Sequence, residues 1–175
     1  MLIVNLFGAP GAGKSTLAAY IFAKLKMAGV NAELVTEFAK DKTWENNQKA
    51  LANQVYVFGK QLYRITRCQD DVDVIVTDSP LLLSVIYNHS DILGEDFNNL
   101  VYKVFSSYDN ANYFINRVKK YNPKGRNQTE EESDKIAVEV KEMLNKYCVD
   151  YTEADGVLES ADVIADTVLH YYLKR

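Results

Sequence analysis

The chain has 175 residues, a length typical of one domain of roughly 100–200 residues. It is 47% hydrophobic and 25% charged, with a net charge of −4, and this acidic balance argues against a nucleic-acid coat protein or a basic membrane binder. Two cysteines are too few for a disulfide framework or a four-cysteine zinc site. We expect one domain over residues 1–175, in the cytoplasm and without a membrane segment.

Residues 2–7 form a short apolar run, which is typical of a buried parallel strand. No basic region precedes this run and a glycine loop follows it, so we interpret it as a strand rather than a signal peptide. Further strands are expected over 32–36, 72–77 and 111–116. Helices are expected over 14–28, 45–69 (one helix, or two broken at Gly59), 94–107, 129–147 and 159–173.

Strands and helices alternate along the chain, and this pattern predicts an α/β fold with a parallel sheet covered by helices on both faces. Thr129 and Glu132 have the spacing of a capping box at the start of the 129–147 helix. Parallel sheets bind ligands at the carboxyl ends of their strands. The loops after residues 7, 36, 77 and 116 are therefore expected to surround one site.

The loop after the first strand reads GAPGAGKS over residues 8–15 and matches the P-loop pattern G-x-x-x-x-G-K-[ST]. Glycines let backbone N–H groups turn toward one oxyanion, the Lys14 ammonium reaches the β- and γ-phosphates, and the Ser15 hydroxyl reaches Mg²⁺. The predicted ATP-binding residues are Gly8, Gly11, Ala12, Gly13, Lys14, Ser15 and Thr16. The motif leaves open whether the phosphate goes to water or to a substrate.

A carboxylate, Glu37, follows the second strand. At that place it can take a proton from a hydroxyl that attacks the γ-phosphate, and the alternative is a solvated loop glutamate. Trp44 is the only tryptophan. It either stacks on a planar ligand or anchors its loop on the core.

Two glutamines, Gln54 and Gln61, are seven residues apart and share one helix face with Phe58 between them. Amides can pair with the edge of a nucleobase, and Phe58 can form a wall beside it. Arg64 lies near the same face and completes the predicted substrate-binding set. The alternative for the glutamines is an exposed polar face, and Val57 is expected in the core.

Asp78 ends the apolar run of the third strand, where a carboxylate can hold a water of the Mg²⁺ shell opposite Ser15. The alternative is that it caps the helix that follows. Residues 117–126 then carry five positive charges and no acid, which suits a lid over phosphates. We expect this lid at about residues 117–128, with Arg117 and Arg126 acting on the transferred phosphoryl group. The alternative is a solvated basic turn that pairs with the glutamates at 130–132.

The glycine loop, Glu37, the TDSP sequence at 77–80 and the GRNQTEEE run at 125–132 resemble the bacteriophage-type P-loop ATPase/kinase proteins. These are related to the nicotinamide riboside kinase domain and, more distantly, to deoxynucleoside kinases. The resemblance implies a P-loop NTPase three-layer sandwich with a five-stranded parallel sheet and a lid. It also implies these roles: Glu37 is the base, Gln54 or Gln61 the nucleobase reader, Asp78 the metal-side acid, and Arg117 and Arg126 the lid arginines.

We therefore expect an ATP- and Mg²⁺-dependent kinase that transfers the γ-phosphate to a hydroxyl of a nucleoside, nucleotide or related small metabolite. One alternative is a bacteriophage kinase that acts on hydroxymethylated bases in DNA, supported by the basic loop and weakened by the acidic charge. Another is an ATPase without a small-molecule acceptor. A monomer or a homodimer is expected, in the host cytoplasm if the protein is of bacteriophage origin.

Overall fold

The apolar strand at the start of the chain lies at the centre of a parallel sheet in the computed structural model, which describes residues 1–122 and 128–173. Within these residues the sheet has five strands in the order β2-β3-β1-β4-β5, and every neighbouring pair is parallel. The strands are β1 (Leu2–Phe7), β2 (Ala32–Val35), β3 (Val74–Thr77), β4 (Asp109–Asn116) and β5 (Thr152–Asp155).

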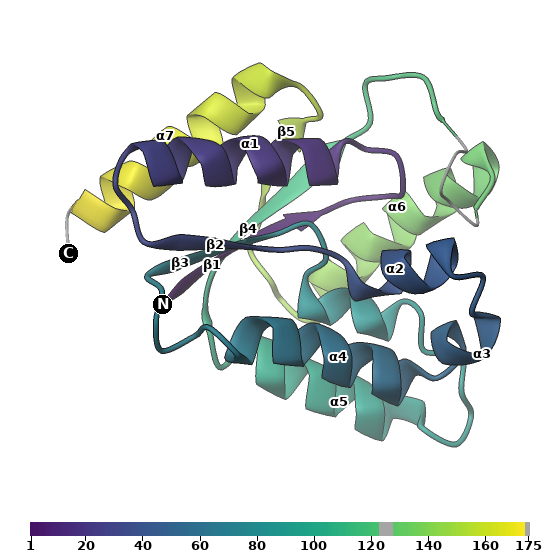
Figure 1. Cartoon of the computed structure of the whole chain (residues 1–175). Coiled ribbons are helices and arrows are strands. Elements are labelled where there is room, and N and C mark those ends of the chain that lie inside the picture. Colours follow the sequence, from purple (N-terminus) through teal and green to yellow (C-terminus); the bar gives the residue numbers. More distant parts are fainter. Residues whose placement is uncertain (123–127, 174–175) are drawn as a thin grey trace.

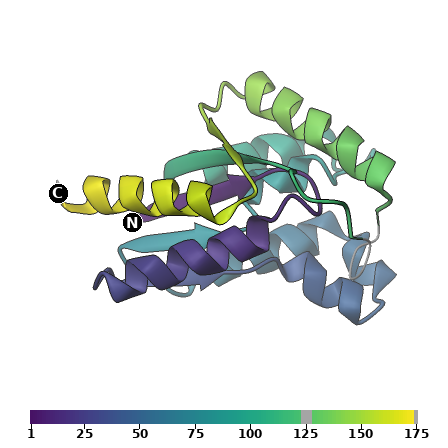
Figure 2. The ribbon, with the colours of Figure 1, turned by 90° about the horizontal axis from the view of Figure 1, so that it is seen from above.

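Helices cover both faces of this sheet, as Figures 1 and 2 show, so the predicted three-layer sandwich is confirmed. On one face lie α1 (Lys14–Met27) and α7 (Leu158–Leu173). On the other lie α4 (Gln54–Thr66), the short 3₁₀ helix η1 (Leu81–Val85), α5 (Gly94–Phe105) and α6 (Glu130–Lys146). The short helices α2 (Phe38–Trp44) and α3 (Gln48–Leu51) stand between β2 and α4.

The core forms around β1, which carries apolar side chains on both of its faces. Successive side chains of a strand point to opposite sides of the sheet. Leu2, Val4 and Leu6 accordingly pack in the hydrophobic cluster of α1 and α7. Ile3 and Phe7 pack in the cluster of α4, α5 and α6. Every residue of β1 is buried, which fixes the strand and the glycine loop that follows it.

The predicted helix over 45–69 is wrong in its start and its break. The chain turns at residues 45–47 and 52–53, and Gly59 lies inside α4. The side chains of Asn47 and Asn53 accept hydrogen bonds from the backbone N–H groups of Ala50 and Tyr56, which caps α3 and α4. Gly59 is tolerated because it faces open space, so the asparagine caps determine the helix boundaries.

The other predicted elements are confirmed to within about two residues, the ordinary disagreement at helix and strand ends. The capping box at the start of α6 is present: Thr129 N donates to Glu132 at 2.7 Å, and Glu132 N donates to Thr129 at 3.2 Å. No residues had been assigned to β5, which is mostly exposed. Among the described residues, no helix is long and apolar enough to cross a membrane.

Candidate active site

The loop between β1 and α1 has a positive φ at three glycines, Gly8, Gly11 and Gly13. Gly8 has φ +134°, and a Cβ there would lie 2.6 Å from the carbonyl oxygen of Ile115. Gly13 has φ +99° and precedes the first turn of α1. The Lys14 ammonium donates to the carbonyl oxygens of Gly8 at 2.8 Å and Ala9 at 2.9 Å. The loop thus wraps around the lysine, with the N-terminus of α1 beside it, an arrangement that suits a bound phosphate.

A second close glycine contact comes from the C-terminal part of the chain. Gly156, in the loop between β5 and α7, would place a Cβ 2.2 Å from the carbonyl oxygen of Ala12. Its N–H donates to the carbonyl oxygen of Asn116 at 2.9 Å. The β5–α7 loop therefore lies directly against the P-loop and limits which residues fit there. No motif surrounds Gly156 in the sequence, so no local pattern predicts this contact.

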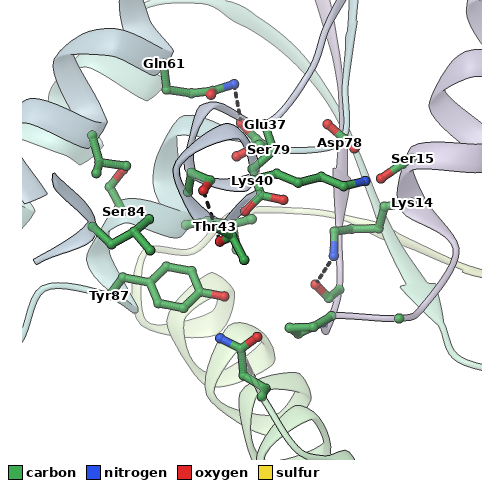
Figure 3. A pocket seen from close by; sticks show the side chains of 18 of the residues that line it. Lys14, Ser15, Glu37, Lys40, Thr43, Gln61, Asp78, Ser79, Ser84 and Tyr87 are labelled. Atoms are coloured by element: carbon green, nitrogen blue, oxygen red, sulfur yellow. Dashed lines mark hydrogen bonds between the residues drawn. The ribbon is translucent and has the colours of Figure 1, made fainter. Parts of the chain in front are cut away.

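A cavity of about 430 Å³ opens beside the P-loop. Figure 3 shows many of the side chains that line it. The lining residues come from the P-loop, from α2 to α4, from the loops after β2 and β3, and from η1 and the residues just after it, with Gln128 from the segment before α6. The predicted site residues among them are Gly8, Gly11, Gly13, Lys14, Ser15, Thr16, Glu37, Trp44, Gln54, Gln61 and Asp78. The carboxyl ends of β1, β2 and β3 therefore meet at one site, as the parallel sheet predicts.

Asp78 and Ser15 lie on the same side of the cavity (Figure 3). Asp78 is only 4% exposed, and its Oδ1 has no hydrogen-bond partner among the described residues. A buried carboxylate oxygen without a partner calls for a cation or a water of its shell. Figure 3 also shows the extended Lys40 side chain with its ammonium directed toward these two residues. The region between Ser15 and Asp78 thus suits a positive charge, and Mg²⁺ fits the residues present.

Glu37 faces this region from the end of β2 (Figure 3). Burial raises the pKa of its carboxyl above the ordinary value, the charge of Asp78 raises it further, and Lys14 and Lys40 act in the opposite direction. Tyr87 lines the same cavity, and burial, with the negative charge of Glu37, raises the pKa of its hydroxyl. A carboxyl whose pKa is raised toward neutrality is suited to exchange protons with a substrate.

Gln61 holds the Glu37 loop in place. Its Oε1 accepts from the N–H of Phe38 at 2.9 Å, and its Nε2 donates to the carbonyl oxygens of Thr36 at 3.3 Å and Ser79 at 3.2 Å. The Gln61 amide, only 4% exposed, therefore joins the loops after β2 and β3. Gln54 differs: its Nε2 donates to Leu51, while its Oε1 is buried at the cavity without a partner among the described residues.

Two predicted substrate-binding residues do not line the cavity. Phe58 is buried in the core, edge-on to Phe97, and Val57, expected in the core, lines the cavity instead. Arg64 donates to Thr36 and pairs with Asp41, so it braces the start of α2 from outside. Phe58 and Arg64 miss the cavity because of how α4 is oriented about its axis. Its buried face carries Phe58, Gln61 and Ile65.

Of the described part of the predicted lid, Gln128 lines the cavity, whereas Arg117 lies against α6. Arg117 forms ion pairs with Glu130, at 3.2 Å, and with Asp134, and its guanidinium stacks on the ring of Tyr121. The predicted pairing of the basic segment with the glutamates after it is thus present for Glu130. Arg117 does not line the cavity in this arrangement. Arg126 lies outside the described residues.

Polar residues beyond the predicted site residues also line the cavity: Lys40, Thr43, Gln48, Ser79, Ser84, Tyr87 and Gln128. Lys40 lies three residues after Glu37 and four before Trp44, a spacing that places all three on one side of α2. This spacing was visible in the sequence. It indicates a common face only if residues 38–44 form a helix, and no helix is expected there from the sequence.

The glycine loop, the parallel sheet and the Lys14–Ser15 start of α1 define a P-loop NTPase. Residues 3–160 match the AAA domain family, so the chain belongs to that family. Among solved structures it is similar to deoxyadenosine kinase from M. mycoides with bound dATP, with a TM-score of 0.60 and 17% identity, over 94% of this chain and 98% of that one. This likeness confirms the predicted kinase-like P-loop fold. No curated protein matches the sequence.

Proposed function

We propose that the protein is a kinase that transfers the γ-phosphate of ATP to a hydroxyl of a small acceptor. The observation that carries the proposal is the position of Glu37. Its carboxyl shares one cavity with the P-loop, near enough to Lys14 and Asp78 that their charges act on its pKa. An ATPase needs only a water beside the γ-phosphate, whereas a base with a wide cavity behind it suits a larger hydroxyl compound.

The proposed step begins with the acceptor hydroxyl beside Glu37. As the acceptor oxygen forms its bond to the γ-phosphorus, its proton passes to the Glu37 carboxylate. The bond from the γ-phosphorus to the bridging oxygen breaks, and the electron pair stays on the β-phosphate of ADP. Lys14 and the N–H groups of the P-loop bind the phosphate oxygens on which charge develops.

Ser15 and Asp78 are the proposed metal-side residues. When bound, Mg²⁺ would neutralise charge on the β- and γ-phosphate oxygens. The Ser15 hydroxyl and the Asp78 carboxylate would hold the metal in this proposal, Ser15 directly and Asp78 through a water. The buried, unpartnered Oδ1 of Asp78 supports its role.

The walls of the cavity favour an acceptor with a planar group, such as a nucleoside or nucleotide. Trp44 is 65% exposed at the cavity and has a ring face free for stacking. The unpartnered Oε1 of Gln54 is an acceptor for an N–H group on the edge of a base. The fold shared with a deoxyadenosine kinase supports the same class of acceptor. Gln61, whose amide is engaged by the backbone, positions Glu37 in this proposal.

We also propose that residues 117–128 form a lid of a single kinase domain spanning 1–175. Arg117 would leave its ion pairs on α6 and turn toward the phosphates when the site closes. The two acids of these pairs are more than half exposed although Arg117 itself is only 16% exposed, and surface pairs stabilise by about 0–1 kcal/mol, so binding energy can offset their loss. A cytoplasmic location and a bacteriophage origin stay predictions of the sequence.

The test is a comparison of ATP turnover alone and with a panel of acceptors, comprising nucleosides, nucleotides and DNA with hydroxymethylated bases. The proposal predicts a phosphorylated nucleoside or nucleotide and ADP in equal amounts, with little ATP hydrolysis in the absence of acceptor. Lys14→Ala should abolish transfer and serves as the control. Rapid hydrolysis that no acceptor changes would support the ATPase instead, and phosphorylation confined to DNA would support the base kinase.

A further inference from the structure

Lys40 belongs to the face of α2 that lines the cavity. Glu37 directly precedes α2, Lys40 lies in its first turn and Trp44 is its last residue, so all three follow one side of the helix. Lys40 is an exposed residue at the mouth of the cavity, and in Figure 3 its side chain is extended with the ammonium pointing toward Ser15 and Asp78. One short helix thus presents a carboxylate, an ammonium and an aromatic ring to the same space.

Helix α2 is anchored to its neighbours, and this limits where the Lys40 side chain can reach. The N–H of Phe38 donates to Gln61 at 2.9 Å, and Asp41 forms an ion pair with Arg64 of α4. The Thr43 hydroxyl donates to the carbonyl oxygen of Ala39 at 3.2 Å within the helix. The backbone of Lys40 is therefore held on the cavity side, while its flexible stem lets the ammonium follow a ligand over a short range.

The charges of the cavity show why a second cation is needed. Among the described residues that line it, Lys14 and Lys40 are cationic and Glu37 and Asp78 are anionic. A nucleoside triphosphate would add several negative charges to this space. Lys14 approaches from the P-loop side, where it already contacts Gly8 and Ala9. Lys40 approaches from α2, on the side of the cavity where the terminal phosphate would meet the acceptor.

We propose that Lys40 is a phosphate-binding residue that contacts the terminal, γ-phosphate of the nucleotide, opposite Lys14. This proposal rests on the nucleotide site of the proposed function and adds to it the residue that distinguishes a triphosphate from a diphosphate. With the metal bound between Ser15 and Asp78, the Lys40 ammonium turns from these residues to a γ-phosphate oxygen. A diphosphate leaves this position empty and gains nothing from Lys40.

The test compares the affinities of Mg²⁺·ADP and of Mg²⁺ with the non-hydrolysable β,γ-imido analogue of ATP, measured by titration calorimetry. A hydrogen bond to a charged group contributes about 1.5–3 kcal/mol, which is roughly tenfold or more in affinity. Lys40→Met, which keeps the length of the side chain, should weaken binding of the triphosphate analogue about tenfold and that of ADP less than twofold. Lys40→Arg should restore most of the difference.

Lys49→Met is the matched control, because it removes an exposed lysine of α3 that does not line the cavity. It should leave both affinities unchanged. Equal effects of Lys40→Met on ADP and on the analogue, or no effect on either, would overturn the proposal. Tighter Mg²⁺ binding with an unchanged triphosphate preference would also overturn it, since Lys40 would then only compete with the metal. No acceptor is needed, so a protein that proves to be an ATPase would refute the kinase proposal and leave this test valid.

Discussion

The Ser133 hydroxyl of α6 donates a 2.7 Å hydrogen bond to the carbonyl oxygen of Pro10 in the P-loop. Ser133 is fully buried and lies one turn into the helix that follows the proposed lid. Through this bond the start of α6 is attached directly to a loop that lines the cavity. The position of the lid helix and the shape of the phosphate loop are therefore linked by one side chain.

Ser133→Ala tests this link. The change leaves the Pro10 carbonyl without its protein donor and should lower the free energy of unfolding by about 1 kcal/mol. For a chain of this size that is roughly 2–4 °C in Tm. Mg²⁺·ADP affinity should fall as well, because the loop is less well held. Ser106→Ala, which removes an exposed hydroxyl at the end of α5, is the control and should change neither quantity. Equal effects of the two changes would show that the Ser133 bond is unimportant.

The two glutamines of α4 should behave differently. Gln61→Ala leaves the buried N–H of Phe38 unpaired, which costs about 1–3 kcal/mol, and should lower Tm by several degrees. Gln54→Ala should raise the KM for the acceptor, by roughly tenfold for one lost hydrogen bond, with little change in Tm. Thermal melts and acceptor titrations on both variants show which glutamine supports the fold and which contacts the acceptor. The opposite pattern would make Gln61 the residue that reads the acceptor.

Asp78→Asn should weaken the dependence on Mg²⁺ more than the affinity for nucleotide without metal. The amide keeps the shape of the side chain and loses the charge opposite the cation. Residues that orient metal ligands typically change metal affinity by about 10–100-fold, and we expect a shift of at least tenfold in the Mg²⁺ titration. Asp73→Asn, just before the opposite end of β3, should leave the titration unaltered. An unchanged titration for Asp78→Asn would make it a structural residue.

Arg117→Ala should lower kcat by at least about tenfold and raise the KM for ATP much less, because a lid arginine acts on charge that develops during transfer. Its ion pairs with Glu130 and Asp134 are partly exposed, so Tm should change little. Arg67→Ala, which removes an exposed arginine near Glu33 at the far end of β2, is the control. If Arg117→Ala transfers phosphate as fast as the Arg67→Ala control, the basic segment after β4 is a solvated turn and not a lid. The same assay applies to Arg126→Ala.

The sequence predicted the parts of the fold whose signals are local. The P-loop needs a fixed set of residues between an apolar strand and a helix, and both were recognisable from residues 2–28. β5 was not found, because a short edge strand with exposed side chains has no apolar pattern. α2 was not predicted, and α3 was merged with α4 in the helix expected over 45–69, because single asparagine caps are weak local signals.

Site residues that directly follow a strand were predictable from the sequence. Site residues on a helix were not, because the orientation of the helix about its axis decides which side chains face the cavity. Glu37 and Asp78 line the cavity because strand ends leave little freedom of position. Phe58 and Arg64 were placed on the wrong side, since α4 turns Gln61 inward to bind the loops after β2 and β3. The contact of Gly156 with the P-loop joins residues far apart in the sequence, so no local pattern could reveal it.

The raised pKa of Glu37 has consequences of opposite sign for catalysis and stability. As a base Glu37 acts in its charged form, so transfer should fall as the pH drops through a pKa above the ordinary 4.5. A carboxyl whose pKa is raised by folding stabilises the fold when protonated, and this stabilisation is lost as the pH rises through the folded-state pKa. Glu37→Gln should therefore have a higher Tm than the wild type at neutral pH, and the difference should shrink in acid.

The rate of phosphoryl transfer by Glu37→Gln, measured with the acceptor identified for the wild type, tests the central claim most directly. The amide cannot accept the proton of the acceptor hydroxyl, so the rate should fall by roughly 10²–10⁴-fold. Binding of the β,γ-imido analogue of ATP should be retained, because the P-loop is unchanged. Transfer at the wild-type rate would contradict the account, since the hydroxyl would then lose its proton without Glu37.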